Sequence, residues 1–354
     1  MSKKKKKFKE SIGIDIGSHS IKIVHLVRRK NRLELANYAV KKTVPEDIEY
    51  NPSDLSNSRY APLISRMFKE MNIKPNKKKH IVSAIGGDNV SIKQIKTIFL
   101  PEDELESALF FEAKKHLPIS GSDMILDYQV INVEEKTNNM NILLAASKKE
   151  QLDRHTSILN SAGVIPGTVD IEPLAIVNSL TLNYPVEEGA YVMLDLGAHT
   201  TNMVIYSPES KLFSRNIDFG GYMLTKDIMK QKGIAFSEAE EFKLKYGLKE
   251  KSDKKKDDIV ALDIAEKTAV EQIALAVRRS MRFYVKEAGN SDFRKIYLTG
   301  GTANTLGLPK FLEKQLNIPV EKFNPFESVR VPRDLKYNPD PQLTLAMGLA
   351  LRPE

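Results

Sequence analysis

Carboxylate, glycine and hydroxyl residues occur together at two places in the chain, each time after a short apolar run. These places are Asp15-Ile16-Gly17-Ser18-His19-Ser20 and Asp195-Leu196-Gly197-Ala198-His199-Thr200-Thr201. Glycine lets the backbone turn tightly, and successive N–H groups in such a turn can cradle phosphate oxygens, with hydroxyl groups as further donors. A carboxylate at the end of a strand suits Mg²⁺ held through water. The pattern predicts two phosphate-binding turns, with Asp15 and Asp195 facing the metal.

A third glycine site, Leu298-Thr299-Gly300-Gly301-Thr302, follows another apolar run. Its glycines would let an adenine or a phosphate lie against bare backbone. Each of the three sites, taken separately, is also compatible with an ordinary turn. Their order and their shared context favour a single nucleotide site assembled from three turns.

Two similar strand–turn–strand segments must position these turns. Residues 12–16 and 21–27 are expected to form a hairpin that 33–40 extends, and residues 191–196 and 202–206 are expected to form a second hairpin. Asp195 follows Asp15 by 180 positions, which indicates duplication of one structural unit.

Helices and strands alternate through the rest of the chain. The periodicity predicts helices over 60–71, 101–116, 149–161, 173–182, 222–233, 237–246, 264–288 and 345–351, with strands over 79–85, 142–147 and 294–298. Ser237 and Glu240 have the spacing of a capping box. Such alternation predicts layered α/β sheets in two halves, with a ligand cleft between them.

The composition excludes several classes of protein. The chain contains no cysteine, which excludes disulfides and thiolate metal sites, and its six histidines form no i, i+4 pair. No apolar run approaches the roughly 20 residues that a membrane span needs, and the start does not resemble a signal peptide. We therefore expect a cytoplasmic protein.

The net charge of +8 is concentrated at the N-terminus, where Lys3 to Lys7 contribute five positive charges to a tail that we expect to be disordered over residues 1–10. The remaining body is nearly balanced, so nucleic acid is not an expected partner. The tail lysines are either simply solvated or attracted to anionic lipid headgroups, where they would assist another anchor.

The three glycine sites resemble the two phosphate loops and the adenosine loop of the actin, sugar-kinase and heat-shock-chaperone ATPase superfamily. This resemblance implies an actin-like ATPase fold, with two duplicated RNase H-like α/β halves around a cleft that holds ATP or ADP and Mg²⁺. The nucleotide-binding residues that it implies are Gly17, Ser18, His19, Ser20, Lys22, Gly197, Ala198, His199, Thr200, Thr201, Gly300, Gly301 and Thr302.

Further stretches extend the resemblance. Ile171-Glu172-Pro173-Leu174-Ala175 is similar to a chaperone motif, which implies that Glu172 orients the attacking water. Glu240 and Lys243 resemble a helix pair that contacts the nucleoside, although a surface ion pair has the same spacing. Ala198 and His199 stand where chaperones have glycine, and Asn202 stands where they have an acid. Because Asn cannot act as a base, we expect binding with at most slow hydrolysis.

Within this superfamily the chain resembles the PilM family and, less closely, FtsA. Residues 100–118, LPEDELESALFFEAKKHLP, carry most of this distinction, since they resemble the start of a small α+β subdomain inserted in both families. We expect a first half over 11–91, joined by 149–186 and 340–352, an insert over 92–148, and a second half over 187–339 that contains a helical subdomain at about 222–262. FtsA-like proteins continue into an amphipathic membrane helix, which we do not expect here.

Membership of the PilM family would imply a scaffold in the platform that assembles type IV pili or a related type II secretion system. Such a scaffold lies peripherally at the inner membrane and binds the N-terminal cytoplasmic peptide of a PilN-like membrane protein, together with other platform or motor proteins. Residues 99–118 are the expected wall of the peptide groove, unless their apolar side chains face the insert's own core. An FtsA-like division protein and a sugar kinase or ATPase of the same fold are the alternatives, although no base for an acceptor hydroxyl is evident.

Overall fold

The computed structural model describes residues 9–30, 32–44, 57–75, 80–116, 123–210, 212–248, 268–335 and 337–352. The predicted loop 249–258, the start of the helix predicted over 264–288, and Lys3 to Lys7 lie outside the described residues. The first strand begins at Glu10, inside the tail that we expected over residues 1–10.

The first sheet has the strand order β3-β2-β1-β4-β8. Its strands are β1 (Glu10–Ile16), β2 (Ser20–Arg29), β3 (Arg32–Lys42), β4 (His80–Ile85) and β8 (Thr168–Ile171). Strands β1, β2 and β3 are antiparallel, whereas β4 runs parallel to β1 and β8 runs parallel to β4. Helices α1 (Asn57–Glu70) and α3 (Lys149–Ser161) share an apolar core with this sheet.

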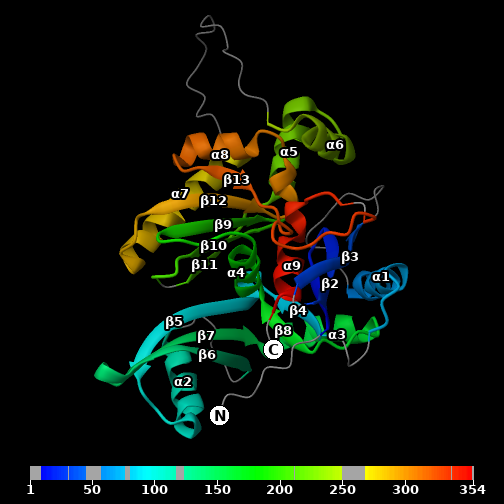
Figure 1. Cartoon of the computed structure of the whole chain (residues 1–354). Coiled ribbons are helices and arrows are strands. Elements are labelled where there is room, and N and C mark those ends of the chain that lie inside the picture. The colour runs from blue at the N-terminus through cyan, green and yellow to red at the C-terminus, as the bar shows by residue number, and fades with distance from the viewer. Residues whose placement is uncertain are drawn as a thin grey trace, which may run out of the picture.

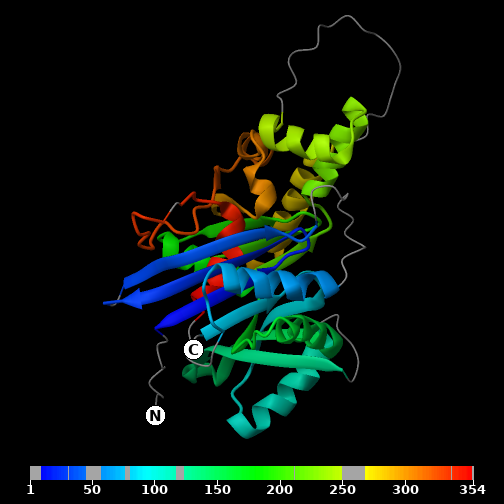
Figure 2. The same ribbon diagram turned by 90° about the vertical axis from the view of Figure 1, so that its right-hand side faces the viewer.

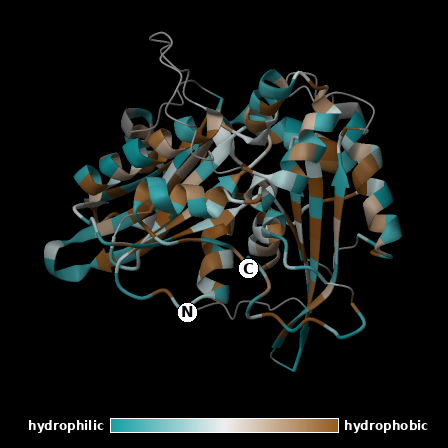
Figure 3. Cartoon of the chain, turned by 90° about the horizontal axis from the view of Figure 1, so that it is seen from above, coloured by the Kyte–Doolittle hydropathy of each residue, from teal (hydrophilic) through white to brown (hydrophobic). Residues whose placement is uncertain are grey.

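The second sheet repeats this topology with the order β11-β10-β9-β12-β13. Its strands are β9 (Ala190–Leu196), β10 (Thr201–Tyr206), β11 (Phe213–Ile217), β12 (Phe293–Thr299) and β13 (Val320–Lys322). Helices α7 (Ala269–Ala288) and α8 (Leu308–Leu316) contribute to its core. The predicted duplication of one unit is confirmed. The strands in the interior are largely apolar, as Figure 3 shows in brown.

Two helices lie between the sheets, α4 (Glu172–Asn183) and α9 (Thr344–Ala350) (Figure 1). Their apolar side chains join residues from both sheets in one core, which includes Val82 of the first half and Val204 of the second. Two glycines allow this close packing. A Cβ on Gly13 would overlap the backbone of Ala346, and a Cβ on Gly348 would overlap the carbonyl of Ala175.

The chain crosses between the halves twice, and the side chain of Asn183 ties the two crossings together. Its amide nitrogen donates to the carbonyl of Pro325 at 2.8 Å, and its oxygen accepts from the backbone N–H of Ser328 at 3.0 Å. The neighbouring Tyr184 hydroxyl accepts from the N–H of Asn324 at 3.2 Å. Asn183 is buried, so these bonds are made away from solvent.

The third sheet has the order β5-β7-β6 and belongs to the inserted subdomain. It comprises β5 (Val90–Ile98), β6 (Met124–Glu134) and β7 (Asn139–Lys148), with α2 (Glu102–His116) packed on it. Leu105, Leu109 and Ala113 of α2 are buried in the insert's core, so these side chains do not line a groove.

Two hydrogen bonds link the insert region to the second half. The Gln94 side chain of β5 accepts from the N–H of Leu212 at 3.3 Å, and Asp88 accepts from Asn216 at 3.1 Å.

Two small helices, α5 (Gly221–Lys232) and α6 (Phe236–Tyr246), lie together at the end of the molecule away from the insert (Figure 1). The capping box predicted for Ser237 and Glu240 is wrong. The helix starts earlier, and Glu238 accepts from the N–H of Ala235 at 3.3 Å. In the described part of the chain, no helix is long and apolar enough to cross a membrane.

Candidate functional site

The first predicted phosphate turn connects β1 and β2, and Asp15 sits just before it. Asp15 pairs in register with Lys22 across the hairpin, and their side chains form an ion pair of 3.0 Å. Thr43, just after β3, holds the turn from outside. Its N–H donates to the carbonyl of His19 at 2.9 Å, and its hydroxyl donates to the carbonyl of Ser18 at 2.6 Å. Gly17 has little room for a side chain, because a Cβ would lie 2.9 Å from the backbone carbonyl of Ser20.

The second predicted turn connects β9 and β10 in the same way. The N–H of Gly197 donates to the carbonyl of Thr200 at 2.9 Å, which closes the turn. The start of α5 supports it, since the N–H groups of Gly221 and Tyr222 donate to the carbonyls of Gly197 and Ala198 at 3.0 and 2.8 Å. In this hairpin Asp195 pairs in register with Asn202, whereas in the first hairpin Asp15 pairs with Lys22.

The third glycine site lies against the second turn. Gly300 has a φ of +79° and contacts Leu196 so closely that a Cβ would overlap its backbone, which is why glycine is needed there. The Thr302 hydroxyl donates to the carbonyl of Gly197 at 2.9 Å. By contrast, a Cβ on Gly301 would meet no heavy atom within 4 Å, so this backbone faces open space.

Three carboxylates surround the Lys22 ammonium. Burial, reinforced by the charges of Asp15 and Asp195, raises the pKa of Glu172 to about 8. Burial and the charge of Asp15 raise the pKa of Asp195 to about 6, although Lys22 and a 2.9 Å hydrogen bond from Thr299 oppose this rise. Burial would lower the pKa of Lys22, but Asp15, Asp195 and Glu172 raise it above its ordinary value. Three carboxyl groups therefore share one ammonium group, and ionisation of Glu172 and Asp195 is disfavoured.

Glu172 reaches this cluster from the first turn of α4. Its carboxyl lies over Gly86, where a Cβ would overlap it, and Asn202 from the second half donates a hydrogen bond to it. Glu172 thus contacts residues from both halves of the molecule.

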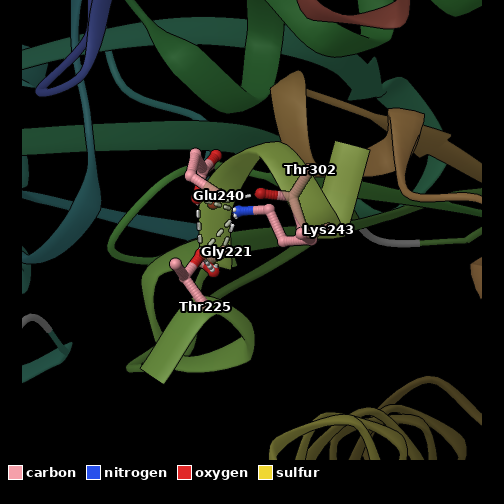
Figure 4. Close-up of polar contacts among 6 residues, drawn as sticks. Gly221, Thr225, Glu240, Lys243 and Thr302 are labelled. Carbon is pink, nitrogen blue, oxygen red and sulfur yellow. Dashed lines mark hydrogen bonds and ion pairs between the residues drawn. The ribbon is translucent and has the colours of Figure 1, made fainter. Parts of the chain in front are cut away.

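Glu240 and Lys243 lie on α6 and face α5 (Figure 4). The Lys243 ammonium donates to Glu240 at 2.7 Å, to the Thr225 hydroxyl at 2.8 Å and to the Gly221 carbonyl at 3.2 Å. The Thr225 hydroxyl also donates to Glu240 at 2.5 Å. Lys243 is only 5% exposed, so this is a buried network and not the surface ion pair that the spacing also allowed.

The pKa of His19 connects this network with the first half. Burial lowers the pKa of His19, and the next largest influences on it come from the charges of Glu240 and Lys243. For Glu240 itself, burial would raise the pKa, but Lys243 and Thr225 lower it below its usual range. The first turn and the α5–α6 pair therefore lie near each other.

Several residues that shape the site were not predicted from the sequence. Gly86 makes room for Glu172, Gly220 makes room for Ala198 and His199, and Thr43 and Thr299 hold the first turn and Asp195. The adjacent Gly220 and Gly221, at the start of a helix, were the available signal for a close backbone contact. The roles of Gly86 and Thr43 depend on contacts distant in sequence, which no local pattern reveals.

The donor set fits a magnesium nucleotide. The buried carboxylates repel one another, and a divalent cation would relieve that repulsion. The described residues contain no group of three or more His, Cys, Asp or Glu that could hold a metal ion directly.

Two sheets of the same topology, with helices α4 and α9 between them and a turn from each half meeting at one point, define an actin-like ATPase fold. The family model of type IV pilus assembly protein PilM matches residues 13–354, and the chain belongs to this family.

The solved structures that resemble the chain have the same fold. One is a PilM–PilN type IV pilus biogenesis complex, which is 23% identical and matches with a TM-score of 0.77 over 96% of this chain and 97% of that one. Another is the ethanolamine utilization protein EutJ from Carboxydothermus hydrogenoformans, which is 15% identical, with a TM-score of 0.53 over 97% of this chain and 89% of that one.

Curated relatives include cell division protein FtsA of Helicobacter pylori, which is 24% identical over 59% of this chain. The match spans 46% of that relative, so the chain covers less than half of its length.

Proposed function

We propose that the protein is a nucleotide-responsive scaffold of the type IV pilus assembly platform. In this proposal it binds ATP or ADP with Mg²⁺ between its halves, and it binds the N-terminal cytoplasmic peptide of a PilN-like inner-membrane protein. That partner would hold it at the cytoplasmic face of the inner membrane. The family match over residues 13–354 is the observation that carries the proposal.

The nucleotide would be held mainly by backbone groups. The turns at 17–20 and 197–201 would donate N–H groups to the phosphates, and Lys22 would offset phosphate charge. Gly301 would lie against the nucleoside, because the space beside its backbone is open. Glu240 and Lys243 would contact the nucleoside from α6. Bound Mg²⁺ would supply electrostatic stabilisation of the phosphates, with Asp15 and Asp195 orienting its water ligands.

Slow hydrolysis at most is expected from the same residues. A pKa of about 8 means that Glu172 retains its proton near neutral pH in the nucleotide-free state, and a protonated carboxyl cannot accept a proton from water. Asn202, opposite Asp195, is also unable to act as a base. These features favour a protein that uses nucleotide to set its conformation.

The exposed apolar residues of the insert support the position of the peptide site. Phe111 on α2 is 65% exposed and Phe99 just before α2 is 47% exposed. Exposed aromatic side chains of this size are frequent anchors of protein interfaces. We place the peptide against these two residues, within the segment 99–118 that the sequence suggested.

A calorimetric titration with the partner's N-terminal peptide, with and without Mg-ATP, tests this function. We expect saturable binding that changes with nucleotide, and weaker binding for Phe99→Ala and for Phe111→Ala by about tenfold or more. Ile165→Ala is the matched control, since Ile165 is 77% exposed but lies outside the insert. Absence of binding in both states would contradict the scaffold proposal and favour a division or enzymatic role.

A further inference from the structure

Six cationic side chains gather at one edge of the first half. This basic edge consists of Lys9, Arg28, Arg29, Lys30, Arg32 and Arg330, and all six residues are exposed. Lys9 lies just before β1, the next four residues surround the β2–β3 turn, and Arg330 comes from the long segment between β13 and α9. The start of β1, the β2–β3 turn and the 324–340 segment lie on the left side of the molecule in Figure 2.

Backbone hydrogen bonds hold these distant segments together. The N–H of Arg28 donates to the carbonyl of Lys9 at 2.9 Å, which fixes Lys9 beside the hairpin. The N–H of Arg330 donates to Leu33 at 3.1 Å, and the N–H of Leu35 donates to Arg330 at 2.9 Å. Arg330 therefore extends the sheet beside β3, and the fold itself places its charge at this edge.

The carboxylates nearby leave most of this positive charge uncompensated. Glu34 is shared by Arg29 and Arg330, at 3.3 and 3.7 Å, and Glu10 pairs with His25 at 3.1 Å. Within the described ranges, no carboxylate forms an ion pair with Arg28, Lys30 or Arg32. The edge thus presents an excess of positive charge to solvent.

The proposed nucleotide does not account for this charge. Strand β2 runs from Ser20, in the first phosphate turn, to Arg29 at the basic edge. At about 3.3 Å per residue, its two ends lie about 30 Å apart. Because exposed charges are screened over about 8–10 Å at physiological ionic strength, the edge can act only on a different anionic partner.

From this arrangement we infer that the basic edge is a second membrane contact, which binds the headgroups of anionic phospholipids directly. A hairpin tip carrying several cations can meet a negatively charged lipid surface without a shaped pocket. The nearby aromatic rings do not favour single-stranded nucleic acid. Tyr38, Phe326 and Tyr337 pack on one another, with ring centroids 6.3 and 5.5 Å apart, and so do not offer faces for base stacking.

The sequence that precedes Lys9 is also basic. Lys3 to Lys7, outside the described residues, precede Lys9 by only a few positions. The proposed contact goes beyond binding of the partner peptide, because it would orient the molecule as well as hold it. Lipid contact through the edge would turn the first half toward the membrane.

Co-sedimentation of the full chain with vesicles tests this inference. One set contains phosphatidylcholine only, and the other is an equal mixture of phosphatidylcholine and phosphatidylglycerol. The edge variant combines Arg28→Gln, Lys30→Gln and Arg32→Gln, and the control variant combines Lys226→Gln, Lys230→Gln and Lys232→Gln of α5, at the far end of the molecule in Figure 2. Both variants lose the same total charge.

We expect the wild type and the control to bind the anionic vesicles, with binding that weakens as salt is added. We expect the edge variant to bind them on the order of a hundredfold less tightly, since each lysine or arginine contributes about fivefold near such a surface. A variant with Arg28→Lys and Arg32→Lys should retain binding, because it keeps the charge. Unchanged peptide binding by the edge variant would show that its loss of vesicle binding does not come from misfolding.

Several results would overturn the inference. Equal binding by the edge and control variants would mean that only total charge matters, and equal binding to both vesicle types would exclude headgroup charge. Failure of the wild type to bind anionic vesicles, together with edge-dependent binding of an oligouridylate probe, would assign the surface to nucleic acid. Titration of the edge variant with the partner peptide separates failure of the lipid inference from failure of the scaffold proposal. The edge variant should bind the peptide as the wild type does.

Discussion

At the scale of single residues, the cluster of Asp15, Asp195, Glu172 and Lys22 favours binding at the expense of stability. Three carboxylates lie around one ammonium group, and two of them have raised pKa values. A raised pKa means that the ionised form is disfavoured in the folded state. Residues that destabilise a protein in the absence of its ligand are common at functional sites, which is why stabilising substitutions there tend to reduce function.

The first prediction concerns Asp195→Asn. Ionised Asp195 is unfavourable in the folded state, and Asn can still accept the hydrogen bond from Thr299, so the substitution should stabilise the nucleotide-free protein by about 1–3 kcal/mol near pH 8. It should also reduce the rise in Tm caused by Mg-ATP, because ligand stabilisation depends on affinity. Thermal unfolding with and without Mg-ATP measures both effects. Asp334→Asn, at an exposed position, is the control, and an undiminished ligand shift in Asp195→Asn would contradict the metal assignment.

The second prediction concerns pH. Because the pKa of Glu172 is about 8 in the folded protein and about 4.5 when unfolded, the folded state binds more protons between these values. The free energy of unfolding should therefore fall as pH rises through this window, and Glu172→Gln should remove this contribution. Urea unfolding measures this effect. Between about pH 6 and about pH 8, the wild type should lose about 1–3 kcal/mol of unfolding free energy relative to the variant. A constant difference would mean that Glu172 is ionised throughout.

His155 gives the free energy of unfolding a pH dependence opposite to that of Glu172. Comparing the wild type with Glu172→Gln separates the two, because both proteins contain His155. Its side chain on α3 bonds Ser83 of β4 at 2.8 Å, and burial lowers its pKa to about 4. Because the unfolded state takes up a proton first, this contribution to stability is present above about pH 6.5 and is lost as pH falls toward about 4. The two windows overlap between about pH 4.5 and about pH 6.5, so the contributions of Glu172 and His155 oppose each other there, and above about pH 6.5 only the fall due to Glu172 remains.

At the scale of elements, α9 is the helix whose packing is most constrained. It lies between β1 and α4, and its Gly348 approaches the carbonyl of Ala175 with no space for a methyl group. Backbone on both sides cannot move aside as a flexible side chain would, so overpacking there must displace a helix.

The third prediction compares two glycines. Gly348→Ala should destabilise the protein by about 3 kcal/mol or more, because the new methyl group overlaps the backbone of α4. Gly301→Ala should leave stability nearly unchanged, since its Cβ would meet open space, but it should weaken nucleotide binding. Urea unfolding and the Mg-ATP shift in Tm measure the two effects. If Gly301→Ala binds nucleotide as the wild type does, the third glycine site does not face the ligand.

The elements that sequence patterns predicted well are those that carry their own signals. Helix α3 begins and ends at the predicted residues, and Gly163, with a φ of +76°, follows its end. Strands β5, β6, β8, β11 and β13 were not predicted. Strands β8, β11 and β13, which have 4, 5 and 3 residues, are too short to show a period and depend on pairing with distant strands. The early start of α6 has the same explanation, since its first residues pack on Tyr222 of α5.

The turns of the candidate site were predictable because glycine and hydroxyl residues mark them locally. Whether Glu240 and Lys243 form a buried network could not be predicted, since the answer depends on Thr225 and Gly221 from another helix. In the same way, the spacing of apolar residues in α2 could not show whether they line a peptide groove or face the core of the insert. Contact with the insert's own sheet buries Leu105 and Leu109, while Phe111 remains outside.

At the scale of the whole molecule, the insert and the proposed nucleotide site are connected through the second half. Gln94 of β5 bonds the segment that joins β10 to β11, and β10 begins at the second phosphate turn. A shift of the second half on nucleotide binding would thus reach the insert through these contacts. Coupling between two sites of this kind typically amounts to about 1–3 kcal/mol.

The fourth prediction tests that connection. Gln94→Ala should leave peptide affinity in the absence of nucleotide within about twofold of wild type, but it should reduce the effect of Mg-ATP on that affinity. Calorimetric titration with the partner peptide in both states measures the difference. Gln231→Ala, at an exposed position on α5, is the control. If the nucleotide effect is as large in Gln94→Ala as in wild type, the coupling takes another route.

Asn183 also constrains how the two halves can move. Because it binds Pro325 and Ser328 on the returning segment, both crossings pass through the same place. If the two halves rotate against each other when nucleotide binds, these adjacent crossings are where the axis of rotation would lie. In such a rotation, the displacement of each residue grows with its distance from the axis. The insert and the α5–α6 pair, at opposite ends of the molecule in Figure 1, are the parts that would travel furthest.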